Sequence, residues 1–490
     1  MDFLDPNRLK QHRILLRFGY ALAAVGIAIA CVILLWQAYG YSVKNGKVVQ
    51  DGMIFISSQP NPASIYINGV LNAATTDTRL TIQAGAYSFK LALNKYRPWQ
   101  HVIVNLGGQV VHYDYPLLFP NQLSQTKISS FNAAPAFASQ SISQQYLLVA
   151  SVDNFTSFLL FDITNPTNAP TTLTLPAGIV TPSNGAQSWQ VIGWADDNQH
   201  LLLKHIYGTS SEFIELNISD PTQSININKT FKITPTDVTL NNLKYNQYYF
   251  YDATSQTLSS AALNSNNNVL IAVASNVLAF KSYQNNEILY VTANGAPAFQ
   301  VAVDLLSNNI SYLMRDLPAA PTYLLDMAGY SGDDYAVIGD SAYSFVDIYK
   351  NPLSQAKVMT NAKILPFRAI RIMQPNYESF APTAQLIMVE NGAAFAVYDI
   401  FNDAIYHYQA PLPLDPPQVH ARWMDGDRLI YVSGGKITVA DFDNTNRQTL
   451  SSALAQYRIF FAPDYRSYFT LDTASTSGSI ELSQVSLIAQ

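Results

Sequence analysis

A charge-free segment near the N-terminus constrains this chain more than any other feature. Phe18–Trp36 runs for 19 residues without a charged side chain. At the rise of an α-helix, such a segment spans close to the thickness of a hydrocarbon core. We therefore predict a transmembrane helix over residues 18–39.

The residues that flank this segment predict its orientation. Basic side chains all lie on its N-terminal side, and aromatic residues close the other side. Lys/Arg clusters stay in the cytoplasm, and Trp and Tyr favour the membrane interface. Residues 1–17 are then a cytoplasmic arm, and the C-terminal bulk is extracellular in a single-pass protein of the cell membrane. The topology charges are Arg8, Lys10, Arg13 and Arg17, and the anchor residues are Phe18, Trp36, Tyr39 and Tyr41.

Two processing alternatives compete with an uncleaved anchor. Ala38-Tyr39-Gly40 could serve as a signal-peptide cleavage site, although the apolar run exceeds the usual core of such a peptide. Cys31 could be lipidated, since residues 28–31 loosely resemble a lipobox, but the sequence stays apolar after it. The simplest interpretation of Cys31 is a small apolar side chain within the membrane helix.

The composition favours a β-rich surface protein. Charged residues make up only 13% of the chain and apolar residues 48%, while 30 tyrosines are present. The only cysteine is Cys31, so disulfides cannot stabilise the part beyond the membrane. Beyond residue 17 there are 24 basic and 32 acidic side chains. This acidic balance argues against nucleic acid as a partner, because phosphate binding needs clustered positive charge.

After a linker at residues 40–51, residues 52–120 predict a small β-sandwich. Short β-rich runs alternate with turn pairs such as Asn68-Gly69 and Gly107-Gly108. Asn-Gly supplies the positive φ angles of a tight hairpin. Side chains alternate along a strand, so Tyr87, Phe89, Leu91 and Leu93 share one face.

This stretch resembles the PEGA domain. The resemblance lies in Ile54–Pro60, in Pro62–Gly69 and in the Ile82, Gly85 and Tyr87 pattern. It departs from the family in the name-giving motif, where Asn61-Pro62-Ala63 stands near the usual Pro-Glu-Gly-Ala. The resemblance implies a cell-envelope module, chiefly prokaryotic, without assigned catalytic residues.

Residues 124–490 contain a loose internal repeat. An aromatic-rich strand ending in Asp or Asn recurs at intervals of 55, 35, 52, 43, 52 and 42 residues. A four-stranded unit of this length is typical of a β-propeller, and a string of unrelated sandwiches is the alternative. The Tyr248–Asp252 instance is out of register, so seven and eight blades both stay open. The strand near Ile128–Phe131 could complete the last blade and close the ring. The terminal residues are Asp162, Asn217, Asp252, Asp304, Asp347, Asp399 and Asp441.

A second recurring piece links a small or aromatic residue, an acidic turn and an apolar strand. It begins at Trp194, Trp423 and Ala462. Asp and Asn accept backbone hydrogen bonds in turns, so we interpret the recurring acids as turn residues. Trp194 and Trp423 are interpreted as blade-packing residues.

No catalytic or cofactor-binding motif is recognisable, and we expect no cofactor and no enzymatic activity. The seven histidines are scattered and form no zinc pattern. Asp441, Asp443 and Asn446 are weak calcium candidates, because their oxygens are hard ligands at short spacing. The distal glutamate of an EF-hand is absent, so solvated turn chemistry is the simpler interpretation.

The expected fold is therefore an all-β ectodomain, a PEGA-like sandwich plus a seven- or eight-bladed propeller, tethered by one transmembrane helix. The leading functional hypothesis is a binding or scaffolding protein of the cell envelope. Its partners would be the lipid bilayer, through the helix, and a surface glycan or envelope protein, through the propeller. The alternatives are an extracytoplasmic glycoside or lactone hydrolase and an envelope-assembly factor that docks another membrane protein.

Overall fold

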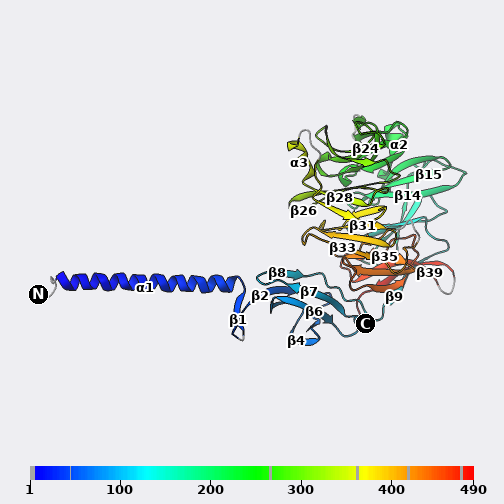
Figure 1. Cartoon of the computed structure of the whole chain (residues 1–490). Helices are drawn as coiled ribbons and strands as arrows, with labels where there is room; N and C mark the ends of the chain where they lie inside the picture. The colour runs from blue at the N-terminus through cyan, green and yellow to red at the C-terminus, as the bar shows by residue number, and fades with distance from the viewer. Residues whose placement is uncertain are drawn as a thin grey trace. The chain divides into compact units, whose positions relative to one another are not determined.

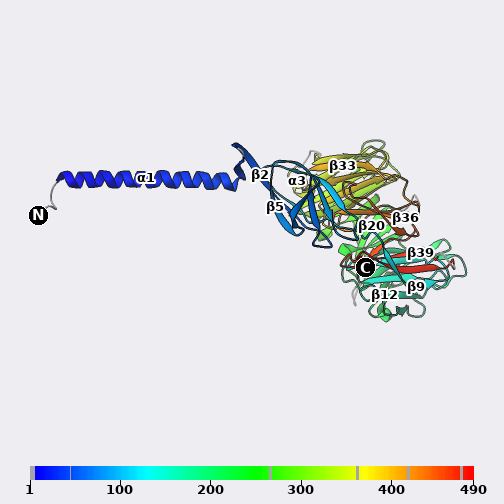
Figure 2. The ribbon, with the colours of Figure 1, turned by 90° about the horizontal axis from the view of Figure 1, so that it is seen from below.

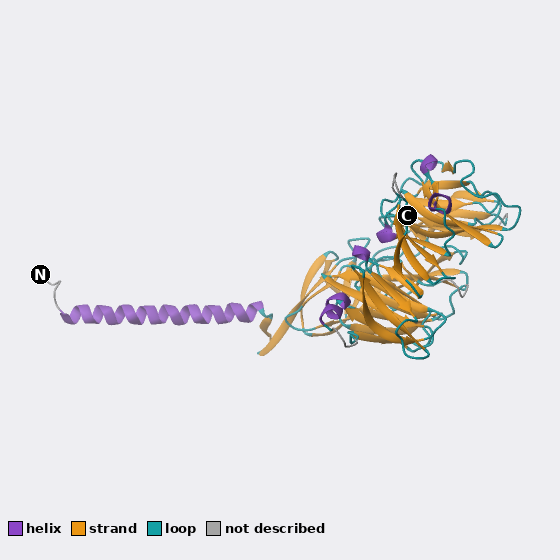
Figure 3. Cartoon of the chain, turned by 90° about the horizontal axis from the view of Figure 1, so that it is seen from above, coloured by secondary structure: helices purple, strands orange, loops and turns teal. Residues whose placement is uncertain are grey.

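The computed structural model describes residues 6–44, 46–263, 268–359, 364–415, 420–474 and 478–489. The chain divides into two compact units, Met1–Gln122 and Leu123–Gln490. Outside one long helix, most of the regular structure is β-strand (Figure 3).

The long helix α1 spans Pro6–Ala38 (blue in Figure 1). An 18-residue window within its segment Arg13–Ala38 has a mean hydropathy of 2.5, and none of that window is buried in the protein. By length and composition this helix can cross a membrane. The helix begins at Pro6, within the predicted cytoplasmic arm, and ends at Ala38, one residue before the predicted end of the transmembrane span.

Two four-stranded sheets form the sandwich of the first unit. One sheet pairs β2 with β1, β5 and β8, and the other has the order β4-β3-β6-β7. Buried apolar side chains, Ile54, Ile65, Phe89 and Leu91 among them, fill the space between the sheets. The strands are β1 (Tyr41–Lys44), β2 (Lys47–Ile56), β3 (Ser64–Ile67), β4 (Val70–Thr75), β5 (Thr78–Gln83), β6 (Gly85–Ala92), β7 (Trp99–Asn105) and β8 (Val110–Tyr113).

The predicted linker at residues 40–51 is wrong, because these residues form part of the first sheet. β1 pairs with the beginning of β2, with Val43 opposite Val48. The turn between them includes Gly46, whose φ of +73° favours glycine. The backbone N–H of Asp51 also donates to the carbonyl of Gly40 at 2.7 Å. The β-branched residues on both sides of the turn therefore extend the sandwich back to residue 41.

The second unit contains eight four-stranded sheets among the described residues, which we number as blades in the order of their first strands. Blades 1–4 are β10 (Phe137–Gln140), β11 (Tyr146–Ala150), β12 (Ser157–Asp162), β13 (Thr171–Thr174); β14 (Gln187–Trp194), β15 (His200–Tyr207), β16 (Ser210–Asn217), β17 (Ile225–Asn226); β18 (Asp237–Leu240), β19 (Gln247–Asp252), β20 (Thr257–Ala262), β21 (Ile271–Ala274); and β22 (Val277–Ser282), β23 (Ile288–Thr292), β24 (Gln300–Ser307), β25 (Ile310–Pro318).

Blades 5–7 continue the same antiparallel pattern, and blade 8 borrows its outer strand from the beginning of the unit. They are β26 (Tyr323–Tyr330), β27 (Asp333–Asp340), β28 (Phe345–Lys350), β29 (Arg368–Arg371); β30 (Tyr377–Phe380), β31 (Leu386–Asn391), β32 (Ala394–Asp399), β33 (Ala404–Gln409); β34 (Arg422–Trp423), β35 (Arg428–Ser433), β36 (Lys436–Asp441), β37 (Gln448–Ser452); and β38 (Phe460–Phe461), β39 (Ser467–Thr473), β40 (Ile480–Ser486), β9 (Ser124–Phe131).

Short helices interrupt the loops of this unit. They are η1 (Pro221–Gln223), α2 (Ile227–Phe231), η2 (Asn241–Leu243), η3 (Gln284–Asn286) and α3 (Pro352–Val358).

The eighth blade confirms the predicted closure. β9 pairs with β40 along its whole length, from Ser124 opposite Ser486 to Phe131 opposite Ile480. Figures 1 and 2 both show β9 in the same blade as β39, although the two strands lie at opposite ends of the unit's sequence. Closing the last blade with the first strand removes an exposed sheet edge. The structure thus has eight blades.

Apolar clusters join neighbouring blades around the ring. Shared clusters connect blades 1 and 2, 2 and 3, 3 and 4, 4 and 5, 5 and 6, 6 and 7, and also 8 and 1. Blades 7 and 8 are joined by hydrogen bonds, for example from the Tyr468 hydroxyl to Ser451 Oγ at 2.8 Å. The chain has only one cysteine, Cys31 in α1, so no disulfide stabilises the propeller. Burial of these apolar faces is therefore the main contribution to its stability.

The repeat seen in the sequence corresponds mainly to one position in each blade. Six of its seven members end in the third strand of a blade, whereas Tyr248–Asp252 lies in β19, the second strand of blade 3. This shift explains the short interval of 35 residues before Asp252 and the long interval of 52 residues after it. Asp162, Asn217, Asp252 and Asp399 each accept a backbone N–H two residues later, at 2.8–3.0 Å, which confirms their role in turns.

Two members of the repeat are not turn residues. Asp304 lies inside β24 and accepts a hydrogen bond from the Tyr290 hydroxyl at 3.1 Å. Asp347 lies inside β28 and forms an ion pair with Arg315 of blade 4. For these two positions the turn interpretation was wrong, because the strands continue three residues past the acid.

Candidate functional site

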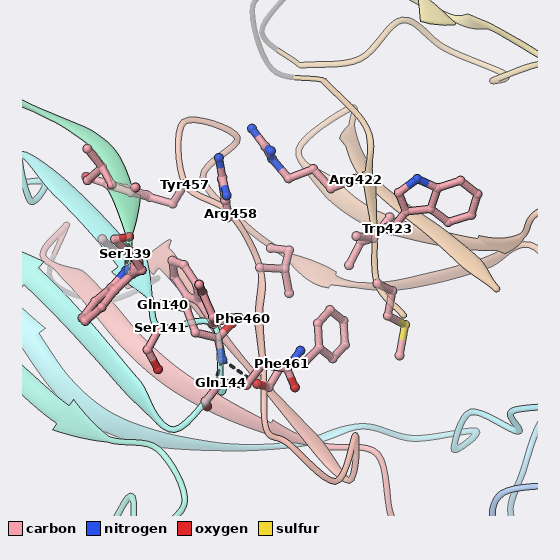
Figure 4. Close-up of a pocket in the computed structure, with 18 of the residues that line it drawn as sticks. Ser139, Gln140, Ser141, Gln144, Arg422, Trp423, Tyr457, Arg458, Phe460 and Phe461 are labelled. Atoms are coloured by element: carbon pink, nitrogen blue, oxygen red, sulfur yellow. Dashed lines mark hydrogen bonds between the residues drawn. The ribbon is translucent and has the colours of Figure 1, made fainter. Parts of the chain in front are cut away.

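A cavity of about 620 Å³ lies against the inner strands of the propeller (Figure 4). Its lining comes mainly from β10, β14 and β34, which begin blades 1, 2 and 7, and from residues 457–461 at the start of blade 8. The first strands of propeller blades surround the central channel. We call this cavity the channel pocket.

Two tryptophans found in the sequence repeat line the channel pocket. The Trp194 indole N–H donates to Ser139 Oγ at 2.9 Å, and the Trp423 indole N–H donates to the carbonyl of Ser379 at 3.2 Å. Trp194 is buried in the cluster between blades 1 and 2, as the packing interpretation predicted, whereas Trp423 is half-buried. Trp423 therefore packs against blade 6 and also borders the cavity.

Glutamines of the first blade supply amides to the same cavity. Gln140 Nε2 donates to the carbonyls of Phe461, at 2.6 Å, and Gln144, at 3.1 Å. Gln144 Nε2 donates to the Tyr465 hydroxyl at 3.2 Å. Their N–H groups thus hold the blade 8 to blade 1 seam, and their amide oxygens remain able to accept hydrogen bonds.

Two arginines give the channel pocket its charge. Arg422 begins β34 in blade 7, and Arg458 precedes β38 in blade 8. Figure 4 shows both guanidinium groups reaching toward the same region. Desolvation and then repulsion from Arg422 lower the pKa of Arg458 to about 10, so the Arg458 side chain stays positive at neutral pH. Among the residues that the structure describes, no Asp or Glu belongs to the lining.

A buried carboxylate, that of Glu390, holds the backbone next to Arg422. Glu390 of β31 accepts hydrogen bonds from His420 Nδ1 at 2.5 Å and from the backbone N–H of Ala421 at 3.0 Å. Burial raises the pKa of Glu390, against the opposing effect of these hydrogen bonds. The His420 ring stacks on Tyr377, with 4.2 Å between ring centroids. This arrangement fixes the backbone immediately before Arg422.

A second group of charges lies on the inner strands of blades 4–6. Lys281 Nζ of β22 is 3.0 Å from Asp326 Oδ1 of β26, and Glu378 lies on the next inner strand, β30. Burial, and then the Asp326 charge, raise the pKa of Glu378 to about 7, although Lys281 opposes the shift. Glu378 Oε2 is buried and has no hydrogen-bond partner among the described residues.

The calcium candidates lie in the turn after β36. Asp443 Oδ1 accepts hydrogen bonds from the backbone and hydroxyl of Thr445, at 3.0 and 2.6 Å, and Asp441 Oδ2 accepts one from Asn446 Nδ2 at 2.9 Å. In the described part of the chain, no group of three or more His, Cys, Asp or Glu side chains is arranged to hold a metal ion. The turn chemistry considered for these residues accounts for the observed contacts.

The charged residues of the channel were not predicted from the sequence. Arg422, Arg458, Lys281, Asp326 and Glu378 match no motif, because each inner strand contributes only one or two of them. The sequence does contain a signal for Arg422 and Arg458. Arg422 directly precedes Trp423, and Arg458 lies four residues before Ala462, so both stand beside recurring pieces that mark the start of a blade.

The fold and these sites define the class of protein: an all-β chain with one N-terminal apolar helix, a PEGA sandwich and an eight-bladed β-propeller. Residues 51–118 match the PEGA domain family, in agreement with the resemblance in the sequence. The comparison with curated proteins finds no match.

Solved structures similar to this chain include several β-propellers. The Dos1 propeller has a TM-score of 0.47 and 10% identity, covering 75% of this chain and 96% of its own. The β-propeller domain of Myceliophteria thermophila Cps50 (Swd1) has a TM-score of 0.39 and 9% identity, covering 74% and 99%. Kluyveromyces lactis Hsv2 has a TM-score of 0.38 and 10% identity, covering 70% and 95%. The propeller assignment rests on the strand pairing described above.

Proposed function

We propose that this protein is a membrane-anchored binding protein of the cell envelope, with the propeller displayed outside the cell. The observation that carries the proposal is the channel pocket, where four blades place aromatic, amide and guanidinium groups around one cavity. Aromatic surfaces and a few convergent polar groups are typical of ligand sites. The ligand is a glycan or a polypeptide, and α1 holds the binding domain at the membrane.

Blocking the channel pocket tests this function. Gly193 lines the pocket, and a Cβ placed there meets nothing within 4 Å, so Gly193→Trp can fill the cavity. The full-length protein in detergent would be incubated with solubilised envelope and with a glycan panel. We expect saturable capture that Gly193→Trp abolishes and that Gly185→Trp retains, because Gly185 lies outside the pocket and a Cβ there meets only Ser183 Oγ at 3.6 Å. Equal capture by all three proteins would refute the channel pocket as the recognition site.

The proposed display outside the cell has its own test. The basic residues before the apolar segment support a cytoplasmic N-terminus. Protease added to intact cells should then remove the propeller and spare the helix. A propeller that resists cleavage until the cells are lysed, although it is cut readily afterwards, would contradict this orientation.

A hydrolase is the second candidate, because Asp326 and Glu378 lie on neighbouring inner strands of the channel. Glycoside hydrolysis uses two carboxyl groups, about 5–10 Å apart, one of which has a raised pKa. Sugar release by the wild type that Glu378→Gln abolishes would support the enzyme.

An envelope-assembly role would instead appear as a stoichiometric membrane-protein partner in detergent extracts.

A further inference from the structure

The arginines of the channel pocket differ from most other arginines of the propeller in their partners. Arg315, Arg368, Arg428 and Arg466 each form an ion pair with an aspartate. Arg422 and Arg458 have no such partner within the described residues, which include every Asp and Glu of the second unit. Two neighbouring positive charges at the surface of one cavity thus have no ion-pair partner among the described residues.

Arg422 is also incompletely hydrogen-bonded. Its Nε is buried and has no partner in the part of the chain that the structure describes. Leaving a buried donor without an acceptor is costly, and native proteins usually satisfy such groups with protein, water or ligand. The donor belongs to the side chain that Figure 4 shows reaching toward Arg458. The unsatisfied donor and the unpaired charges therefore point to an acceptor that the ligand supplies.

The planar guanidinium group matches the geometry of a carboxylate, which it can bind through two parallel hydrogen bonds. The Glu390 carboxylate, on which the Arg422 charge acts to lower the pKa, already accepts hydrogen bonds from His420 and from the Ala421 N–H. The negative charge of Glu390 partly offsets the positive charges of Arg422 and Arg458. Arg422 and Arg458 against Glu390 still leave a positive excess that favours an anion.

The other residues that line the channel pocket indicate which kind of ligand carries the carboxylate. Half-buried Trp423 borders the cavity, and the amide oxygens of Gln140 and Gln144 can accept hydroxyl hydrogen bonds. Aromatic faces cover sugar rings, and amides bond their hydroxyls. We propose that the channel pocket binds a glycan containing a carboxylated sugar, with Arg422 and Arg458 as the carboxylate-binding pair. This inference rests on the proposed binding function and specifies its ligand.

Oligogalacturonate, its neutral methyl ester and polyglutamate are suitable probes. Binding to the full-length protein in detergent would be measured by calorimetry at low and moderate salt. We expect oligogalacturonate to bind at least about tenfold more tightly than the methyl ester, since hydrogen bonds to charged groups contribute strongly. The affinity should fall with added salt.

Variants then locate the carboxylate site. Arg422→Gln and Arg458→Gln should each weaken oligogalacturonate binding about tenfold or more, while binding of the methyl ester changes little. Arg371→Gln is the matched control, because it removes one positive charge from an exposed position on β29, an outer strand of blade 5. The control should bind like the wild type.

Each contrary result has a distinct meaning. Equal binding of the acid and its methyl ester would overturn the carboxylate inference and leave glycan binding standing. Tight binding of polyglutamate alone would overturn it in favour of an acidic polypeptide. Oligogalacturonate binding that survives both substitutions would place the site elsewhere. Absence of binding to every probe, together with capture that Gly193→Trp blocks, would overturn the ligand class while keeping the proposed function.

Discussion

Gln140 and Phe461 are 321 residues apart in the sequence, yet the Gln140 side-chain amide donates a 2.6 Å hydrogen bond to the Phe461 carbonyl. This bond joins the first blade to the last. The Tyr457 hydroxyl reinforces the seam by donating to the carbonyl of Pro135 at 2.6 Å. The same seam contributes residues to the channel pocket, so the site depends on closure of the ring.

Removing the Tyr457 hydroxyl should destabilise the propeller. Tyr457→Phe keeps the buried ring and leaves the Pro135 carbonyl without its donor, a loss of about 1–3 kcal/mol in the free energy of unfolding. Urea denaturation of the full-length protein in detergent measures the loss. Tyr343→Phe, at a half-exposed tyrosine, is the control and should be nearly neutral. Identical midpoints for Tyr457→Phe and the control would show that the seam bond is unimportant.

Local patterns allowed much of the fold to be predicted, since a charge-free helix, hairpin turns and repeated strands are all encoded by neighbouring residues. Blade number was harder. In blade 3 the aromatic run Tyr248–Tyr251 occupies the second strand, and the third strand β20 (Thr257–Ala262) is rich in Ser and Ala. The repeat was therefore counted from the wrong strand. The channel charges were beyond local reasoning, because Lys281 and Asp326 meet only when two blades pack together.

A buried carboxylate in blade 2 should make stability depend on acid. Glu212 accepts hydrogen bonds of 2.7 Å from the Thr181 N–H, the Thr181 hydroxyl and Asn226, and one of 3.0 Å from His205. Burial would raise the pKa of Glu212, but these bonds outweigh it and lower the pKa to about 2. The stabilisation is present above the unfolded pKa near 4.5 and is lost as the pH falls toward 2.

Glu212→Gln tests this dependence. At pH 7 the variant should be less stable by about 3 kcal/mol, and the difference should shrink as the pH is lowered from about 5. Urea unfolding at several pH values measures the difference. Asp153→Asn, at an exposed carboxyl group, should follow the wild type throughout. A constant difference between Glu212→Gln and the wild type from pH 7 to pH 3 would contradict the prediction.

The ionised Glu378 side chain should destabilise the folded propeller at high pH, whereas the ionised Glu212 side chain stabilises it. The pKa of Glu378 is raised to about 7 in the folded protein by burial and by the Asp326 charge. The native state therefore holds the proton more tightly than the unfolded chain, and this stabilisation is lost as the pH rises through 7. Glu378→Gln should be more stable than the wild type at pH 8, by about 1–3 kcal/mol, and should differ less at pH 4. Parallel unfolding profiles from pH 4 to pH 8 would rule out the raised pKa.

Gly52 in the PEGA sandwich should tolerate no side chain. A Cβ at this position would overlap Asn105 Oδ1 and lie 2.8 Å from the carbonyl oxygen of Leu106. Asn105 cannot easily move away, because its Nδ2 donates to the carbonyls of Ile82 and Gln83 at 2.8 and 3.1 Å. Gly52→Ala should therefore destabilise this unit by about 1–3 kcal/mol, as overpacking does.

Hydrogen–deuterium exchange of the full-length protein can detect this effect locally. Amides of β2, β5 and β7 should exchange faster in Gly52→Ala, while amides of the propeller blades keep their protection, because the two units are separate compact bodies. Gly193→Ala is the control, since a Cβ there meets nothing within 4 Å. Unchanged protection of β2 in Gly52→Ala would mean that Asn105 yields without cost, and its hydrogen bonds to β5 would then not hold the sandwich together.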